Sequence, residues 1–396
     1  MAVGRRTMTK AQPAGGRRRL LLAAWVVILL TTAAALAQGA DPASHLHRIR
    51  LPEGFAIQIY ARVPGARSLA YAPDLALLFV GSRRDTVHVV MDRDGDGVGE
   101  TVLPLAQGLR VPNGIAYGDG FLYVAENHRI VRFDLKDWTP GRLLEPEVVY
   151  DRLPRYDYHG WRYLALGPDG RLYVALGVPC NICTTEDPVG AIARLNRDGT
   201  GFEVYARGIR NSVGMDWHPA TGELFFTDNG ADMLGDDIPA DELNHAPRPG
   251  LHFGFPYYAG GRTRSPQFPG PVPVARVSHP VVEFGAHTAS LGIHFYRGAM
   301  FPDEYRHDAF VAQHGSWNRT EPIGYRVKRV RFNERGQPVG KEVFAEGWLL
   351  PDGTAWGRPV DVEELPDGSL LVSDDYAGLI YRITYAPGPG SSATNP

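Results

Sequence analysis

Apolar and polar positions follow a phrase that returns along this chain at wide intervals. Each copy is an apolar run, a turn rich in Pro, Asp and Gly, and a second apolar run with two-residue alternation. Because Asp-Gly supplies the positive φ of a tight turn, each copy predicts a β-hairpin. Five copies are complete: residues 69–82, 115–127, 164–177, 215–230 and 362–375.

The spacing of the copies predicts the fold. Neighbouring copies start roughly 45–50 residues apart, the length of one four-stranded propeller blade. The much longer interval before the last copy holds one partial copy at 309–316 and a Gly/Pro-rich stretch. We therefore predict an all-β fold, a six-bladed β-propeller of four-stranded antiparallel blades over residues 45–385, with five or seven blades as alternatives. Residues 386–396 are expected to be a flexible tail.

The N-terminus differs in composition from the rest. Its first 37 residues carry six basic residues and no acidic one, so the remainder has 35 basic and 44 acidic residues. An acidic body without basic clusters argues against a nucleic-acid partner. Arginines at 17–19, an apolar run at 20–30 and a small-x-small site at 35–37 predict a signal peptide over 1–37. The alternative is an uncleaved membrane anchor, and both interpretations place the protein in the periplasm or outside the cell.

Export changes the meaning of the two cysteines. Cys180 and Cys183 form a C-x-x-C pair, which in a cytosolic protein would suggest zinc or thiol exchange. No second ligand pair is present in the sequence, and an exported protein meets an oxidising environment. We predict a disulfide between Cys180 and Cys183, with an active redox pair as the alternative.

Polar residues gather in the loops that lead into the copies. His159 precedes the third copy, Arg210 and Asn211 precede the fourth, and Arg358 precedes the last. Asn113 takes the same place before the second copy. Because these loops lie on one face of a propeller, the side chains are expected to converge. A histidine beside several guanidinium groups suits a general base acting next to a polyanionic ligand.

These motifs resemble the soluble quinoprotein glucose/sorbosone dehydrogenases, most closely the sorbosone-dehydrogenase-like branch. The resemblance extends from about Pro52 to Ile383 and rests on the phrase between His159 and Asp169 and on the Arg210-Asn211 pair. It implies a six-bladed propeller that binds pyrroloquinoline quinone (PQQ) and calcium. It also implies a small-molecule sugar or aldehyde substrate and a respiratory electron acceptor, a cytochrome or a quinone.

The resemblance assigns roles to single residues. It makes His159 the catalytic base that takes the substrate hydroxyl proton while hydride passes to the quinone. The backbone carbonyls of Gly230 and Ala231 fall where the family binds the calcium of the cofactor. The expected cofactor-binding residues are Asn113, Arg210, Asn211, Arg358 and Arg319.

Four positions depart from the family pattern. Tyr158 replaces the acidic residue before the catalytic histidine, and Val178 stands where an active-site aspartate is expected. Val213 and Val360 replace a glutamine and the second arginine of the last blade. Glucose is therefore not the expected substrate. Asp151, Asp157 or Arg162 are candidates to compensate for the lost carboxylate.

A second calcium candidate lies between the first two copies. Asp92, Asp94, Asp96 and Glu100 surround three glycines in an Asp/Gly-rich segment that resembles the short calcium hairpins of other propellers. Leu103 stands where an EF-hand needs its glutamate, which excludes that motif. The segment is interpreted either as a structural calcium site or as a turn without an ion.

The sequence thus predicts an exported PQQ-dependent dehydrogenase that oxidises a sugar, a sugar-derived aldehyde or an alcohol. Two alternatives belong to other classes. A calcium-dependent lactonase-type hydrolase would account for the acidic loops but not for the arginines. A non-catalytic propeller that serves as a binding module would account for the missing carboxylate and arginine.

Overall fold

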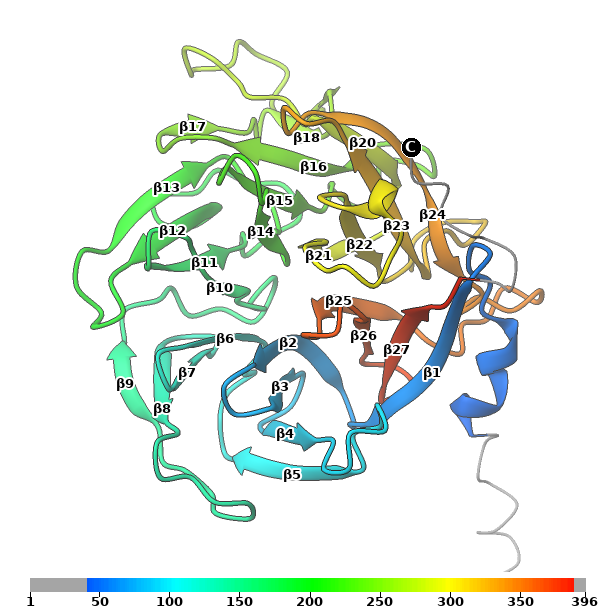
Figure 1. The fold of residues 1–396 in the computed structure, drawn as a ribbon. Helices are drawn as coiled ribbons and strands as arrows, with labels where there is room; N and C mark the ends of the chain where they lie inside the picture. Colours follow the sequence, from blue (N-terminus) through cyan, green and yellow to red (C-terminus); the bar gives the residue numbers. More distant parts are fainter. Residues whose placement is uncertain (1–40, 388–396) are drawn as a thin grey trace, which may run out of the picture. The chain divides into compact units, whose positions relative to one another are not determined.

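The computed structural model describes residues 41–387, and the predicted signal peptide over 1–37 lies outside them. Within that range six sheets are arranged around a central channel (Figure 1), and a short hairpin forms a seventh, two-stranded sheet. The predicted six-bladed propeller is confirmed. Among residues 41–387, helix is confined to two short 3₁₀ segments, η1 (Pro42–Arg48) and η2 (Asp303–Tyr305). None of the helices in residues 41–387 is long and apolar enough to cross a membrane.

The blades follow the chain, and in blades 1 to 5 the first strand is the innermost. Blade 1 contains β2 (Ala66–Ala72), β3 (Leu77–Ser82), β4 (Val87–Met91) and β5 (Thr101–Ala106). Blade 2 contains β6 (Gly114–Gly118), β7 (Phe121–Ala125), β8 (Ile130–Asp134) and β9 (Glu147–Tyr150). Blade 3 contains β10 (Leu164–Leu166), β11 (Leu172–Leu176), β12 (Ala191–Leu195) and β13 (Glu203–Arg207). Blade 3 gains a parallel fifth strand, β17 (Leu251–His252).

Blades 4 and 5 contain the irregular part of the chain. Blade 4 contains β14 (Met215–Trp217), β15 (Leu224–Asp228), β16 (Ala240–Ala246) and β20 (Val282–Ala286). Blade 5 contains β21 (Ser290–Phe295), β22 (Ala309–Gln313), β23 (Arg326–Phe332) and β24 (Pro338–Glu346). Between β16 and β20 the chain adds β17 and the small hairpin β18 (Tyr258–Gly260) and β19 (Thr263–Arg264). The long interval in the repeat is therefore one blade plus this insertion.

Blade 6 closes the ring by joining both ends of the domain. It contains β25 (Pro359–Glu364), β26 (Leu370–Asp374), β27 (Leu379–Tyr385) and, as its outermost strand, β1 (Phe55–Arg62). β1 pairs antiparallel with β27, so that Phe55 faces Tyr385 and Arg62 faces Leu379. Neither end of the propeller can leave without opening the last blade.

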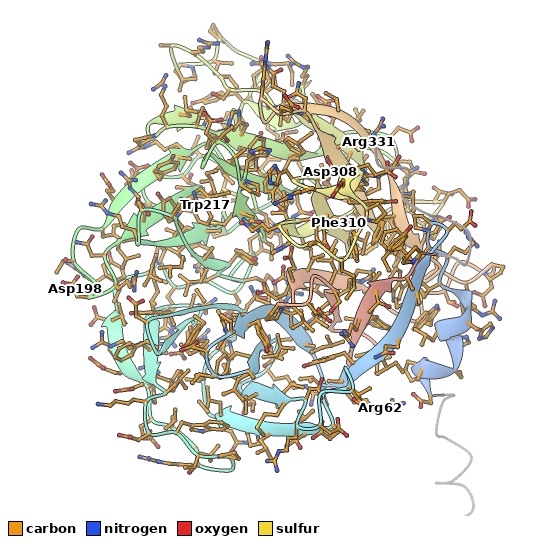
Figure 2. All side chains as sticks on the ribbon, in the orientation of Figure 1. Arg62, Asp198, Trp217, Asp308, Phe310 and Arg331 are labelled. Atoms are coloured by element: carbon orange, nitrogen blue, oxygen red, sulfur yellow. A yellow bond between two sulfur atoms is a disulfide. The ribbon has the colours of Figure 1, made fainter. Side chains whose placement is uncertain are left out.

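A separate hydrophobic cluster fills each gap between neighbouring blades. In β3, for example, Leu78 packs into the cluster shared with blade 6, while Phe79 packs into the cluster shared with blade 2. Successive strand residues point to opposite faces, so a central strand of a blade buries both sets. Figure 2 shows the same division, with Phe310 fully buried between blades and Asp198 exposed at the periphery. The second apolar run of each copy is therefore almost continuously hydrophobic, and the two-residue alternation expected for it is not kept because both faces of the strand are buried.

The innermost strands also enclose a cavity of about 220 Å³ in the channel. All six inner strands contribute to its lining, which includes the side chains of Asp216, His294 and Glu363. The channel is therefore a narrow, partly polar space and not an apolar core.

Candidate active site

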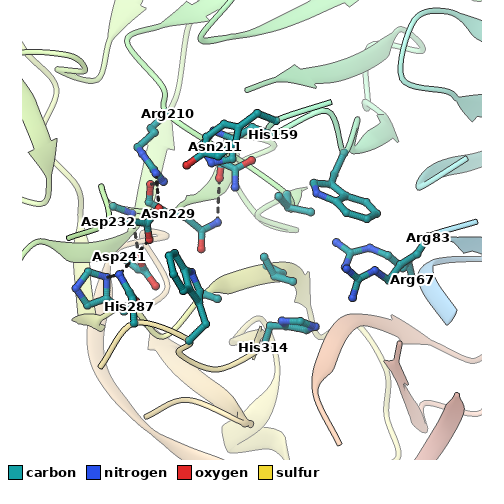
Figure 3. A pocket seen from close by; sticks show the side chains of 18 residues that line it. Arg67, Arg83, His159, Arg210, Asn211, Asn229, Asp232, Asp241, His287 and His314 are labelled. Atoms are coloured by element: carbon teal, nitrogen blue, oxygen red, sulfur yellow. Dashed lines mark hydrogen bonds and ion pairs between the residues drawn. The ribbon is translucent and has the colours of Figure 1, made fainter. Parts of the chain in front are cut away.

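A larger cavity of about 410 Å³ lies where the inner strands begin and the second strands end (Figure 3). Its walls come from the loops before β10, β14 and β21 and from those after β3, β15 and β22, with Arg67 at the start of β2. These strand ends meet at one end of the channel, because the innermost strands of the six blades all run in the same direction along it. The lining residues used below are Arg67, Arg83, Tyr158, His159, Trp161, Arg210, Asn211, Val213, Asn229, Gly230, Asp232, Asp241, His287, His314, Trp317 and Asn318.

His159 stands in the loop before β10 with a positive φ of 51°. Burial, followed by the nearby charge of Arg210, lowers the pKa of the His159 imidazole from 6.5 to about 3, against an opposing hydrogen bond with the Val178 backbone. Its Nδ1 atom is buried and has no hydrogen-bond partner within residues 41–387. The imidazole is therefore neutral at physiological pH and free to accept a proton.

Gly177 lets His159 and Asn211 come together. A Cβ atom at Gly177 would lie 2.8 Å from the Cβ of His159 and 3.2 Å from the Oδ1 of Asn211. Both distances are too short for ordinary contact, so a side chain here would push the two residues apart. The end of β11 thus fixes the spacing of the two predicted site residues.

Arg210 is held by a dense set of hydrogen bonds. Its Nε donates to the carbonyl of Asn181 at 2.9 Å, and its Nη2 donates to Oδ1 of Asn181 and Oδ2 of Asp232, both at 2.8 Å. Nη1 donates to the carbonyl of Asn229 at 3.2 Å. The guanidinium is buried, with 4% of the side chain exposed, so its charge is little screened by solvent.

The loop that supplies Asn181 is closed by a disulfide. Cys180 and Cys183 are bonded to each other, as the sequence predicted. The Asn181 side chain also accepts the backbone N–H of Asp232 and donates to the Asp232 carbonyl. This four-residue loop therefore fixes both members of the Arg210–Asp232 ion pair.

Two buried carboxylates shape the backbone beneath the cavity. Asp228 accepts the N–H groups of Arg210 at 2.9 Å and Asn211 at 2.6 Å. Asp241 accepts the N–H of Gly230 and the hydroxyl of Thr288, each at 2.9 Å. Burial raises the pKa of Asp228 to about 7 and also raises that of Asp241. Both residues act by orienting the loops that carry cavity groups.

The opposite wall contains two more arginines. Figure 3 shows Arg67 and Arg83 side by side, across the cavity from Arg210 and Asp232. Both arginines donate to Oδ2 of Asp375, from Nη1 at 2.8 Å for Arg67 and 3.3 Å for Arg83. The cavity is thus bounded by guanidinium groups on two sides.

Comparison with known proteins places the chain in a family. A family model described as "Domain of unknown function (DUF7133)" matches residues 69–391. The chain belongs to this family. The DUF7133 chain is 33% identical over 356 residues to an uncharacterised protein of Borreliella burgdorferi, covering 85% of this chain and 91% of that protein. It is 25% identical over 268 residues to the aldose sugar dehydrogenase YliI of Escherichia coli, covering 62% and 65% of the two chains.

Solved structures share the architecture of the DUF7133 chain. A carbohydrate-active enzyme of family AA12 from Trichoderma reesei has a TM-score of 0.72 at 20% identity, covering 88% of this chain and 99% of that one. The PQQ domain of pyranose dehydrogenase from Coprinopsis cinerea has a TM-score of 0.70 at 18% identity, covering 85% and 97%. The resemblance to quinoprotein sugar dehydrogenases that the sequence indicated is confirmed at the level of the fold.

Four of the predicted site residues of the DUF7133 chain line the cavity, and four lie behind or beside it. His159, Arg210, Asn211 and Gly230 are in the lining. Ala231 is buried, and its N–H bonds the carbonyl of Ala259. The other three bond to protein groups: Asn113 accepts the Nε of Arg67, Arg358 donates to the carbonyls of Gly315 and Ser316, and Arg319 bonds the loop at Asp236 and Asp237.

The positions that depart from the family pattern have two kinds of environment. Tyr158 and Val213 line the cavity, and the Tyr158 side chain is partly exposed. Val178 and Val360 are buried in the protein. The candidate compensating residues do not line the cavity: Arg162, for example, is fully buried and bonds the carbonyls of Asn127 and Pro154.

Arg67, Arg83 and His287 also line the cavity, although no role was predicted for them from the sequence. A signal for Arg67 was present, because it stands two residues before the first copy, as Asn113 stands before the second. Arg83 and His287 lie outside that offset.

The second calcium candidate lies between β4 and β5, away from the cavity lining. Carboxylate oxygens of Asp92, Asp94 and Glu100 lie within 4.8 Å of one another, and Asp96 is not in this group. The carboxylate of Asp96 instead accepts the N–H of Val98 at 2.8 Å. Asp92 also bonds backbone N–H groups, those of Gly95 and Gly97. A structural calcium ion here stays a prediction.

Proposed function

We propose that the protein is an exported dehydrogenase that oxidises a sugar, a sugar-derived aldehyde or an alcohol, using pyrroloquinoline quinone and calcium. The observation that carries the proposal is the cavity of Figure 3, which combines a neutral histidine with guanidinium groups on two walls. Arginines hold carboxylates through charge-assisted hydrogen bonds, and this quinone carries three carboxylates. The likeness to sugar dehydrogenases supports the same choice.

The residues at the cavity fit the cofactor. Asn211 and Asn318 each have a buried Oδ1 atom without a hydrogen-bond partner in the described part of the chain. An amide oxygen accepts a hydrogen bond or binds a cation, so an N–H or O–H group of a ligand, or a calcium ion, would satisfy it. Arg210 and Asn211 would hold the quinone on one side.

The calcium of the cofactor has candidate ligands in the same loop. No hydrogen bond among residues 41–387 ends on the carbonyl oxygens of Gly230 or Ala231. Calcium prefers oxygen ligands of this type. When bound, the quinone would supply the two-electron acceptor for hydride, and the calcium would polarise its carbonyl.

His159 would act as the general base. Oxidation of a CH–OH group removes a hydride from carbon and a proton from the hydroxyl, and the neutral imidazole takes that proton. Burial and then the positive charge of Arg210 lower the pKa of His159, and an anionic ligand that pairs with Arg210 would offset the second of these two effects.

The same cavity disfavours a lactonase-type reaction. That chemistry needs a carboxylate that is free to bind metal and activate water. Asp232 is paired with Arg210, and Asp241 accepts two hydrogen bonds shorter than 3 Å. The charge distribution of the cavity therefore supports anion binding.

The test is reconstitution of the purified mature protein with calcium and the quinone. We expect retention of the quinone after gel filtration and bleaching of its absorbance by members of a panel of aldoses, aldehydes and alcohols. Re-oxidation by a cytochrome or a quinone would identify the electron acceptor. A protein that never retains the quinone would refute the proposal.

A further inference from the structure

The arginine wall of the cavity is built around one buried carboxylate. Arg67 is 4% exposed, and its Nε and Nη1 bond Asn113 and Asp375. No hydrogen bond in the described part of the chain uses its Nη2 atom. A guanidinium keeps its charge even when buried, so Arg67 brings a fixed positive charge and a free donor to the cavity.

Arg83 completes the wall from the loop after β3. Its Cζ lies 5.1 Å from the ring centre of Trp161, and the Cζ of Arg67 lies 4.6 Å from the same centre. Contact with the indole fixes both guanidinium planes. The Arg83 side chain is 46% exposed, so its guanidinium can reach a molecule in the cavity.

The charges of the wall do not balance. Asp375, whose side chain is fully buried, is the one carboxylate that both arginines bond, and it also bonds Nε2 of His314 at 2.8 Å. One negative charge is thus shared by two permanent positive charges. Such an excess beside a partly enclosed cavity attracts an anion, because the surrounding protein screens it weakly.

We propose that Arg67 and Arg83 form a carboxylate-binding subsite of the cavity. The subsite deepens the proposed function, on which it rests for the identity of its ligand: a carboxylate of the quinone or the acid group of an acidic sugar. Arg83 offers a bidentate contact from the rim, and Nη2 of Arg67 donates from below. Arg358, which bonds carbonyls at the side of the cavity, is not needed for this contact.

The experiment measures binding by calorimetry to the purified protein, with the quinone, glucuronate and glucose as probes. Arg83→Gln removes the more exposed arginine and is not expected to disturb folding, which its Tm will check. We expect this change to raise the Kd of either the quinone or glucuronate by about 10-fold to 100-fold, which corresponds to the loss of one hydrogen bond to a charged group. Glucose binding should not change. Arg84→Gln is the matched control, since Arg84 is exposed, adjacent in sequence and outside the lining.

The probes separate the possible outcomes. Weaker binding of the quinone assigns the subsite to the cofactor, while weaker binding of glucuronate alone, measured on the loaded protein, assigns it to an acidic substrate. If the natural protein binds glucuronate in an Arg83-dependent way but not the quinone, the subsite stands and the proposed cofactor fails. If Arg83→Gln matches Arg84→Gln for both acids, or if the natural protein binds neither acid, the subsite is refuted.

Discussion

The chemistry available to His159 is decided by its immediate surroundings. Burial beside Arg210 keeps the ring neutral, and the glycine at Gly177 lets it approach Asn211. The same histidine in a solvated loop would be partly protonated near neutral pH. A neutral ring in an arginine-rich cavity is a proton acceptor, which is the property that the proposed reaction needs.

Replacement of this one side chain should separate binding from chemistry. In the reconstituted protein, His159→Gln should lower kcat by about 10²–10⁴-fold, the usual contribution of a general base. The Kd of the quinone should stay within a few-fold, because the ring does not pair with a carboxylate. Stopped-flow bleaching of the quinone measures the first quantity and calorimetry the second.

His128→Gln serves as the control, since His128 is half-buried and lies outside the cavity lining. A His159→Gln variant that oxidises substrate at the natural rate would remove His159 from the mechanism. Equal losses in both variants would point to a general effect on stability.

At the scale of elements, the disulfide loop after β11 is the feature that most directly positions a cavity group. Asn181 lies between the two cysteines and contributes two of the four hydrogen-bond acceptors around the Arg210 guanidinium. The bond between Cys180 and Cys183 restricts the conformations of this short loop. Arg210 therefore depends on a loop whose geometry is covalently fixed.

Loosening that loop should weaken anion binding without unfolding the propeller. Asn181→Ala removes the side-chain contacts to Arg210 and Asp232, and we expect the Kd of the quinone to rise about 10-fold. Reduction of the disulfide, or the double change Cys180→Ser and Cys183→Ser, should act in the same direction. Calorimetry on the oxidised and the reduced protein measures both effects.

Thr185→Ala is the matched control, because Thr185 lies two residues after this loop and its hydroxyl donates to the Val189 carbonyl. If Asn181→Ala binds the quinone as tightly as Thr185→Ala, the loop does not position Arg210.

The elements themselves could be predicted from the sequence to different degrees. The two inner strands of blades 1 to 4 and 6 match the repeated phrase, because strands buried on both faces must be apolar and their connections are short turns. Three of these turns contain Asp-Gly, and in the first blade Ala76 takes the positive φ instead. In blade 5 the sequence pattern predicted only β22, because a longer connection that contains η2 replaces the short turn after β21. The pairing of β1 with the last blade could not be predicted, because its partner β27 is distant in sequence.

The site shows the same limit. The offset before each copy identifies which residues reach the channel end, but not the direction of their side chains. Asn113 and Arg67 share that offset, yet Asn113 is buried behind the arginine that lines the cavity. Packing against Trp161 and Asp375 decides this difference, and those residues belong to other blades.

At the scale of the whole molecule, closing the ring brings acidic residues of different blades into one narrow channel. Asp361 and Glu363 of β25 lie beside Asp216 of β14. Burial, together with the charge of Asp361, raises the pKa of Glu363 to about 8, and burial raises that of Asp361 to about 7. Glu364 behaves differently: although burial opposes it, hydrogen bonds from His294 and the Arg297 amide lower its pKa.

These opposite shifts predict opposite pH dependence for two neighbouring glutamates. The folded protein keeps the Glu363 proton up to about pH 8, whereas the unfolded chain releases it near 4.5. The contribution of Glu363 to stability therefore falls as pH rises between these values, and the Tm gain of Glu363→Gln over the natural protein should grow up to about pH 8 and then level off. For Glu364 the lowered pKa stabilises the fold above 4.5, so Glu364→Gln should lower Tm at neutral pH, with a deficit that shrinks as pH falls below that value.

Scanning calorimetry of the three proteins from pH 4 to pH 9 measures both trends. Each variant acts as the control for the other, since both remove one carboxylate from the same strand. A Tm difference for Glu363→Gln that stays constant over this range would mean that Glu363 has the same pKa in the folded and the unfolded protein. The channel would then be wet enough to solvate charge, and closure of the ring would not by itself set the protonation of the groups it encloses.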